Sequence, residues 1–378
     1  MPPAPAFHAV PRQAWQASCA THLTASASPA EELPADEKYP VWQGACLRGD
    51  LAEESEQYWR VVDATLGGRQ VPARFTFLHK PHWRFIWPNP DAALGPMPPP
   101  GSDQRIAYWL KNQPWQNFGD FLSELLFAAL ATGPVAGPYE VIHLIGSVIS
   151  TSNIASALSH TSTGPGRPVA FWGCGMREGT FIAPDLLARC AFHGVRGPLT
   201  RDALNLPQNT PLGDPGLLLP LLHTPRPHAL EGEILCIPHY FEPLSDAQLL
   251  EMTGADAVLR PRLRPDPEAC RDFIDAIAGA RLVLAGALHA VITAAAYGVP
   301  FAYLDTGFID LPFKWADFAG AAGFAGRFVK TAEQGMAMYE NTIQPVLRLP
   351  KLAPILEAAP LCAPDQLLAQ ARHYDSGG

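Results

Sequence analysis

The chain has 378 residues, of which 48% are hydrophobic and 17% are charged. This length exceeds one ordinary hydrophobic core, so we expect two domains, and the composition excludes an intrinsically disordered protein. The 27 Lys and Arg residues against 36 Asp and Glu give a net charge of −9, which disfavours nucleic acid as a partner. Any anionic ligand must therefore be held by a local cluster of Arg, His and backbone N–H groups.

The seven cysteines are scattered singly, without a CxxC pair. This spacing predicts no metal site and favours reduced thiols in a cytoplasm, the alternative being a secreted protein with one free thiol. The N-terminus shows no basic, apolar leader, and no run reaches the ~18 apolar residues of a membrane span. We therefore expect a cytoplasmic protein that touches a membrane, if at all, peripherally at its inner face.

Residues 1–104 form an N-terminal extension that is rich in Pro and Ala. The segments RFTFLH (74–79) and HWRFIW (82–87) alternate as short strands do, so part of the extension is expected to be ordered. The run GPMPPPGS (95–102) is typical of a rigid linker. The sequence gives no functional interpretation of this extension.

From residue 105 onward, short apolar runs alternate with helical patterns, which predicts parallel α/β sheets. Residues 105–222 are interpreted as a first Rossmann-like domain. Its expected strands are Ile106–Leu110, Val141–Ile145, Val169–Trp172 and Phe192–Val195, and its expected helices are Phe121–Ala131, Ser152–Ser159, Asp185–Cys190 and Pro198–Leu204.

A connector, HTPRPHALEGE (223–233), is interpreted as the hinge to a second Rossmann-like domain, residues 231–345. The expected strands of this domain are Ile234–Ile237, Ala257–Arg260, Leu282–Ala285 and Val299–Leu304, and its expected helices include Ser245–Met252, Pro267–Ala278 and Thr331–Tyr339. Residues 346–378 form a helical tail with a helix at Pro364–Arg372. We expect the C-terminal helices at 331–339 and 364–372 to pack back onto the first domain.

Two histidines follow strands of the second domain directly. His289 falls where a helix begins after the strand Leu282–Ala285, and His239 follows the strand Ile234–Ile237. In open parallel sheets this carboxyl edge is where ligands bind, because helix N-termini present unpaired N–H groups there. The pair predicts a catalytic site in which His289 is a proton-transfer group, assisted by His239 or Asp120. A structural role for each histidine is the alternative.

Glycine turns and an acidic residue follow the strands of the first domain. In the turn Asn117-Phe118-Gly119-Asp120, Asp120 can serve as an acid or only as a helix cap. Gly146 with Ser147, and Gly173 with Gly175, lie in turns where a phosphate can approach the backbone, or where glycine only serves packing. Neither GxGxxG nor a P-loop is present, which argues against a nicotinamide enzyme and an NTPase.

Three cationic side chains are expected near the same edge. Arg196 ends a strand and offers a bidentate fork that suits carboxylate or phosphate. Lys314, in FKWADF, is a candidate anion contact or a solvated amine, and Arg201 is equally consistent with a surface ion pair.

In chain order, the motifs NFGD, GSV, WGCG, VRGPLTRDAL, LGDPGLLLP, IPHY, LHAVITAAAYGVPFAYLD and FKWADF resemble the polysaccharide pyruvyl transferase family. The chain is similar in particular to the ketal pyruvyltransferases of bacterial exopolysaccharide assembly. The resemblance covers residues 105–318. It implies a fold similar to GT-B glycosyltransferases, with two Rossmann-like domains facing a cleft.

The resemblance also implies phosphoenolpyruvate as donor substrate, no cofactor, and a sugar or lipid-linked oligosaccharide as acceptor that receives a pyruvate ketal. On this likeness His289 matches the family's essential histidine, Arg196 the arginine that holds the donor, Asp120 the acid of the NFGD turn and His239 the histidine of the IPH segment.

One motif departs from the family pattern. Relatives carry Ser or Arg directly before Leu-His-Gly, whereas this chain has Ala287 before Leu288, His289 and Ala290. The donor phosphate would then depend on backbone N–H groups, including that of Leu288, and on Arg196 with Lys314 or Arg177. Two other functions stay open at this point: a GT-B glycosyltransferase that uses a nucleotide sugar, and a glycan-binding relative without catalysis.

Overall fold

The computed structural model describes the backbone of residues 41–42, 59–66, 69–79 and 82–86, and describes residues 105–111, 115–131, 137–161 and 166–377 with their surroundings. Contacts divide the chain into two compact units, Met1–Pro96 and Met97–Gly378. The predicted linker at 95–102 contains this boundary in sequence but lies outside the described residues. The finer division of residues 105–378 into two domains and a tail stays a prediction.

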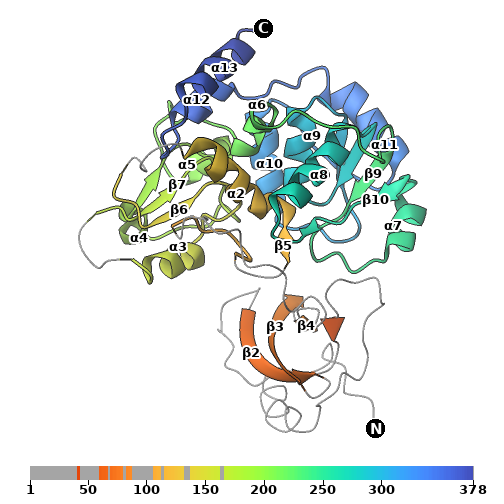
Figure 1. Cartoon of the computed structure of the whole chain (residues 1–378), viewed down its shortest axis with the longest axis horizontal. Coiled ribbons are helices and arrows are strands. Elements are labelled where there is room, and N and C mark those ends of the chain that lie inside the picture. The colour runs from red at the N-terminus through yellow and green to blue at the C-terminus, as the bar shows by residue number, and fades with distance from the viewer. Residues whose placement is uncertain are drawn as a thin grey trace. The chain divides into compact units, whose positions relative to one another are not determined.

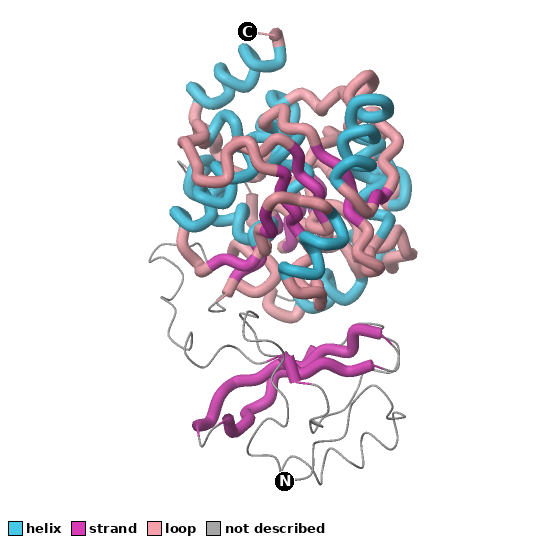
Figure 2. The backbone as a smooth tube through the Cα atoms, turned by 90° about the vertical axis from the view of Figure 1, so that its right-hand side faces the viewer, coloured by secondary structure: helices cyan, strands magenta, loops and turns pink. Residues whose placement is uncertain are grey.

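The first unit contains a four-stranded antiparallel sheet. Its strands are β1 (Val41–Trp42), β2 (Trp59–Leu66), β3 (Arg69–His79) and β4 (His82–Ile86), in the order β1-β4-β3-β2. Figure 2 shows the long hairpin strands in magenta. The register shifts between Phe77 and His79, at the end of β3. The strands predicted around 74–79 and 82–87 are confirmed.

The second unit contains a three-stranded parallel sheet in the order β6-β7-β8. Its strands are β6 (Val141–His143), β7 (Val169–Phe171) and β8 (Cys190–Phe192), and its helices include α3 (Thr151–Leu158), α4 (Pro184–Ala188) and α5 (Pro198–Ala203). Parallel bridges from Val195 to Cys174 and to Leu212 continue the pairing past the strand ends. This continuation brings the turns after β7 and β8 together.

A five-stranded parallel sheet has the order β10-β9-β12-β13-β14. The strands are β9 (Ile234–Ile237), β10 (Ala257–Val258), β12 (Leu282–Ala285), β13 (Phe301–Leu304) and β14 (Phe328–Val329), and the helices are α7 (Asp246–Thr253), α8 (Pro267–Ala278), α9 (Leu288–Ala296), α10 (Pro312–Ala321) and α11 (Ala332–Met338). All four residues of β12 and of β13 are buried, as expected for strands covered on both faces. The predicted α/β class is confirmed.

Local sequence explains where the helices of this sheet begin. Ser245 and Gln248 form a reciprocal capping box at α7, which ends at Gly254 in the left-handed conformation. The Asp266 side chain accepts from the Glu268 N–H, and Pro267 occupies the first turn of α8. The apolar face of α8 then packs against α9.

Helix α2 (Phe118–Leu130) joins the two sheets in one core. It packs against α8 and α9, and its Leu126 shares a hydrophobic cluster with Ile142 of β6 and Val291 of α9. Just before it, β5 (Gln116–Asn117) pairs antiparallel with β11 (Arg262–Leu263). Figure 1 shows α2 between the strands β6 and β7 and the helix α8.

The C-terminal helices α12 (Leu352–Glu357) and α13 (Asp365–Asp375) return to the first sheet's side of the unit. Trp172, just after β7, donates its indole N–H to the carbonyl of Ile355 at 2.8 Å. Helix α12 contacts the short helix η3 (Pro215–Leu218), and α13 contacts α6 (Leu219–Leu222). Helix α11 packs instead on β12 and β13, so the predicted return is confirmed for the tail and wrong for α11.

Two predicted strands of the first sheet are partly wrong. The run 106–110 forms only one bridge, from Ile106 to Ile142, because Leu110 turns the chain with φ of 64°. The strand predicted at Phe192–Val195 lies earlier, at Cys190–Phe192, because Gly194 with φ of 105° interrupts it. Apolar runs locate a strand, but backbone turns set its ends.

Within the described ranges, no helix is long and apolar enough to cross a membrane.

Candidate active site

His289 lies in the first turn of α9, directly after the buried strand β12. The residue before the helix, Ala287, makes no side-chain capping hydrogen bond. The first N–H groups of a helix have no partner within the helix, so an uncapped end attracts an anion. Gly286 allows close approach to the neighbouring strand end, since a Cβ there would lie 2.9 Å from the backbone N of His239.

The imidazole of His289 rests on Gly119 of α2. A Cβ placed on Gly119 would overlap the ring, 2.6 Å from its Cγ and closer still to Nδ1. Only a glycine fits here, since real Cβ atoms do not approach other atoms this closely. The NFGD turn and the histidine, 170 residues apart in sequence, therefore form one contact.

The other ring nitrogen of His289 faces Asp214. Nε2 lies 3.5 Å from Oδ2 of Asp214, which also accepts a hydrogen bond from Nε of Arg196 at 3.0 Å. The second oxygen, Oδ1, accepts from the backbone N–H of Gly216 at 3.0 Å and so caps η3. One fully buried carboxylate thus connects an arginine of the first sheet with a histidine of the second.

Arg196 is fully buried and directed by its neighbours. Its Nη1 donates to Oγ of Ser147 at 2.8 Å, and the turn at Gly175 leaves the space, since a Cβ there would lie 2.5 Å from Nη1. Nη2 of Arg196 and Nε2 of His289 are both buried and have no hydrogen-bond partner among the residues that the structure describes. An unpaired buried donor is costly, so these two atoms mark where a ligand would be accommodated.

The pKa values of the two carboxyl groups beside His289, Asp214 and Asp120, are shifted in opposite directions. Burial raises the pKa of Asp214, but the charges of His289 and Arg196 and the hydrogen bonds outweigh it and lower that pKa to about 2. Burial raises the pKa of Asp120 above its usual range, and a hydrogen bond from Asn117 with the charges of His289 and Lys314 only partly opposes it. Asp214 therefore stays ionised, while Asp120 holds a proton more readily than an ordinary aspartate.

A second carboxylate, Asp310, joins Lys314 and His239. Lys314 is buried and donates to Oδ2 of Asp310, whose other neighbour is Nε2 of His239 at 3.5 Å. Burial raises the pKa of Asp310, but Lys314 and His239 outweigh it and hold that pKa well below its usual range. Lys314 also acts electrostatically on Asp120, which connects this cluster to the first.

His239 has both ring nitrogens next to partners. Nδ1 accepts the backbone N–H of Phe241 at 3.2 Å, so the ring proton sits on Nε2, which faces Asp310. Burial lowers the pKa of His239, and Asp310 opposes that effect. The backbone segments that carry the two histidines lie next to each other, as predicted. Their side chains, however, point to different carboxylates: His239 faces Asp310 and His289 faces Asp214.

Comparison with known proteins identifies the family. The family model for polysaccharide pyruvyl transferases matches residues 117–307, half of the chain, from the NFGD turn to just past β13. The chain belongs to the polysaccharide pyruvyl transferase family. No curated protein and no solved structure matched in the two further searches. The family supports a pyruvyltransferase role in polysaccharide biosynthesis, with a sugar as acceptor.

The pyruvyl transferase match includes Asp120, Arg196, Asp214, His239 and His289 and ends before Lys314. Among the remaining predicted residues, Gly146 has φ of 114° and approaches Asp120, while Gly173 with φ of 62° lies against the turn at Gly213 and Pro215. Leu288 has its side chain in the core, so only its backbone N–H can face a ligand. Arg177 acts electrostatically on Asp120.

Three carboxylates of the candidate active site were not predicted as site residues from the sequence. Asp214 was visible only as part of a turn, although Gly213-Asp214 follows a residue that pairs at the strand edge. Asp310 lies in a loop, where no motif or periodicity of the sequence marks it as a site residue. Asp317, three residues after Lys314, is fully buried and accepts from the N–H of Thr200 at 2.9 Å and from its hydroxyl at 2.6 Å, which joins α10 to α5.

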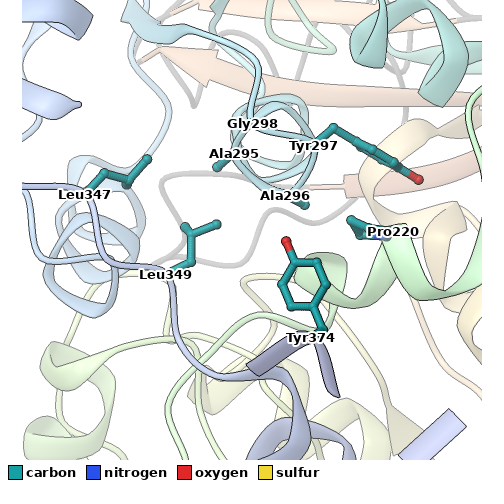
Figure 3. Close-up of a pocket in the computed structure, with 8 residues that line it drawn as sticks. All are labelled: Pro220, Ala295, Ala296, Tyr297, Gly298, Leu347, Leu349 and Tyr374. Carbon is teal, nitrogen blue, oxygen red and sulfur yellow. The ribbon is translucent and has the colours of Figure 1, made fainter. Parts of the chain in front are cut away.

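A cavity of about 500 Å³ lies at the opposite end of α9 from His289. It is lined by Pro220, Ala295, Ala296, Tyr297, Gly298, Leu347, Leu349 and Tyr374. Figure 3 shows these residues around the end of the helix. None of the predicted site residues lines it. No group of three or more His, Cys, Asp and Glu side chains suited to a metal ion occurs in the part of the chain that the structure describes.

Proposed function

We propose that this protein transfers the pyruvyl group of phosphoenolpyruvate to a sugar of an exopolysaccharide or of its lipid-linked precursor and forms a pyruvate ketal. One observation carries the proposal. Arg196 and His289, which follow strands of different sheets, converge on Asp214, and each keeps one buried nitrogen without a partner. A small anion with a carboxylate and a phosphate can engage such donors together with the uncapped end of α9.

The GT-B-like arrangement of two Rossmann-like domains is part of this proposal. The two parallel sheets and the meeting of their carboxyl edges at Asp214 support it. In α/β folds ligands bind at this edge of the sheet. A donor held there would contact both halves of the unit.

The two carboxyl groups beside His289 suggest a division of roles. Asp120, with its raised pKa, would donate a proton to the methylene carbon of phosphoenolpyruvate, and C2 would become electrophilic. His289 would take the proton of the attacking sugar hydroxyl at Nε2, and the negative charge of Asp214, 3.5 Å from that nitrogen, would stabilise the resulting imidazolium. A new C–O bond then forms at C2, and Arg196 would stabilise the charge of the carboxylate or phosphate.

A second sugar hydroxyl attacks C2 in the closing step. The bond from C2 to the phosphate oxygen breaks, inorganic phosphate leaves, and the hydroxyl proton leaves with it. The net reaction converts one diol and one phosphoenolpyruvate into one ketal and one phosphate. The proposal requires no cofactor, and the acceptor would approach from solution or from the inner face of a membrane.

The test is acceptor-dependent phosphate release from phosphoenolpyruvate labelled with carbon-13 at C2, with the ketal carbon followed by NMR. His289→Gln is expected to lower the rate by roughly 10²–10⁴-fold, as for loss of a proton-transfer group. His160→Gln is the matched control, because His160 is exposed. An unchanged rate in His289→Gln excludes its proposed role. A rise in melting temperature with UDP or GDP but not with phosphoenolpyruvate would favour a glycosyltransferase instead.

A further inference from the structure

The C-terminal helix α12 contacts the turn that carries Asp214. Gly213, which directly precedes Asp214, has φ of 143°, a conformation that favours glycine. A Cβ placed on Gly213 would lie 2.9 Å from Cγ1 of Ile355 and closer still to Cδ1. The side chain of Ile355 therefore rests directly on the backbone of Gly213, where no other residue leaves enough space.

The backbone of the same isoleucine is bound to a second turn of the site. Trp172 is fully buried and donates its indole N–H to the carbonyl of Ile355 at 2.8 Å. Trp172 precedes Gly173, where a Cβ would lie 2.7 Å from the carbonyl oxygen of Gly213 and closer still to Pro215. The turn after β7 and the turn before η3 therefore pack against each other, and Ile355 is attached to both.

Helix α12 is itself held by α13. The two carboxylate oxygens of Asp375, at the end of α13, accept the backbone N–H groups of Leu352 at 2.7 Å and of Ala353 at 2.8 Å. These N–H groups begin α12 and have no partner within the helix, so Asp375 caps it. Ile355, in the middle of this short helix, is buried. The helix pair is thus a braced support for the Asp214 turn.

The support matters because the Asp214 carboxylate serves two side chains at once. Oδ2 lies 3.0 Å from Nε of Arg196 and 3.5 Å from Nε2 of His289. Glycine allows the backbone of this turn many conformations, and close packing against Ile355 restricts them. A misplacement of about 1 Å at a reacting group can lower a rate about a hundredfold. A shift of the turn would therefore affect both Arg196 and His289.

We propose that Ile355 is a positioning residue of the active site, which acts through Gly213 to hold the Asp214 carboxylate against His289 and Arg196. This inference rests on the proposed function and gives the C-terminal helix pair a role in it. Helix α12 lies outside residues 117–307, which match the family model, so the family pattern does not indicate this role. Ile355 takes no part in proton transfer.

The test compares two equal deletions in the full chain. Ile355→Val removes Cδ1, the methyl group closest to Gly213. Ile277→Val removes the same atom from a fully buried isoleucine near the end of α8, at the edge of the sheet where β12 begins and not where it ends. Each variant is expected to lower the melting temperature by a few degrees, because each loses one buried methyl group.

The first readout is the environment of the His289 ring and needs no substrate. In protein labelled with nitrogen-15 at histidine, the ring signals of His289 are assigned by their loss in His289→Gln. The chemical shift of an imidazole nitrogen responds to a carboxylate beside it. The His289 signals are therefore expected to move in Ile355→Val and to stay in place in Ile277→Val.

The second readout is acceptor-dependent phosphate release. Ile355→Val is expected to lower the rate about 10-fold, and Ile277→Val less than about 2-fold. A double-mutant cycle then distinguishes positioning from a general loss of structure. In the Asp214→Asn background, Ile355→Val should lower the rate less than about 2-fold further, because the carboxylate through which it acts is already lost. A general structural effect would give the same fold-decrease in both backgrounds.

Two results would overturn the positioning role. One is His289 signals that do not move in Ile355→Val, and the other is an equal fold-decrease from Ile355→Val in the wild-type and Asp214→Asn backgrounds. If Ile355→Val does not fold, Asp375→Ala, which removes only the cap of α12, decides the outcome by the same readouts. His289 signals that move as expected, in a wild type that releases no phosphate from phosphoenolpyruvate, would support the positioning of Asp214 and contradict the proposed function.

Discussion

Oδ2 of Asp214 lies 3.5 Å from Nε2 of His289 and accepts a hydrogen bond from Arg196 at 3.0 Å. The carboxylate therefore fixes which nitrogen of the imidazole faces inward, and Nδ1 is left against Gly119. It also neutralises a guanidinium that is fully buried. Orientation of the histidine and stability of the unit depend on the same side chain.

Asp214→Asn is expected to destabilise the protein by about 3–5 kcal/mol, because it leaves Arg196 buried without its counter-ion. Activity should fall at least about a hundredfold, since the imidazole loses its orienting carboxylate. Urea denaturation and phosphate release measure the two effects. Asp202→Asn serves as control, because Asp202 pairs with Arg201 but is 56% exposed and contributes under about 1 kcal/mol. Equal urea midpoints for the two variants would contradict the assigned role.

Acid should remove the stabilisation that Asp214 provides. Its pKa is about 2 in the folded protein and about 3.9 in an unfolded chain, so the folded state favours the ionised form. The corresponding stabilisation, about 2–3 kcal/mol, is present above pH ~4 and is lost as the pH falls to ~2. The difference in unfolding free energy between wild type and Asp214→Asn should therefore shrink in acid. A difference that stays constant with pH would show that the carboxylate charge is unimportant.

Gly119→Ala should displace the imidazole of His289. The added Cβ would lie 2.6 Å from Cγ of His289, and neither α2 nor α9 can shift freely because they pack against each other. Phosphate release is expected to fall by at least about a hundredfold, as for a misplaced reacting group. Gly279→Ala is the matched control, because its Cβ would meet other atoms only at 3.5 Å and beyond. Similar activity of the two variants would argue against the observed ring position.

The buried carboxyl group of Asp317 should make the free energy of unfolding depend on pH in the sense opposite to that of Asp214. Burial raises its pKa, and the hydrogen bonds from Thr200 oppose this only in part. The folded state then binds the proton more tightly than the unfolded chain, so this contribution to stability falls as pH rises above ~3.9. Asp317→Asn should remove that slope above about pH 4. Asp256→Asn is the control, and its effect on the pH dependence of stability should have the opposite sign. Hydrogen bonds from the backbone and from Arg281 lower the pKa of Asp256.

Apolar runs predicted the buried strands of the second sheet well. Ile234–Ile237 and Leu282–Ala285 have the predicted bounds, as does helix α8, whose cap and N-terminal proline are both local signals. The single bridge at Ile106 could not be predicted in the same way, since the extended run ends at the left-handed turn at Leu110. Local sequence specifies an element best where its ends are set by its own residues.

Only those residues of the candidate site that directly follow a strand or belong to a family motif could be predicted from the sequence. Arg196, Asp120 and His289 meet those conditions, and the structure places Arg196 and His289 against Asp214 and Asp120 within the electrostatic influence of His289. Which carboxylate bridges the arginine and the histidine depends on how two sheets pack, which no local pattern reports. The same holds for Asp310, whose partners lie 4 and 71 residues away in sequence.

The strand pair β5–β11 sets how the unit can move. It attaches the chain just before Gly119 to the segment before α8, so α2 must travel with the five-stranded sheet. On another side, Asp317 anchors α10 to the beginning of α5. A wide hinge opening would rupture one of these two ties, so the exchange of phosphoenolpyruvate for phosphate that we propose would cost less free energy through rearrangement of surface loops. Turnover in this protein should then be governed by loop mobility, which viscosity-dependent kinetics can detect.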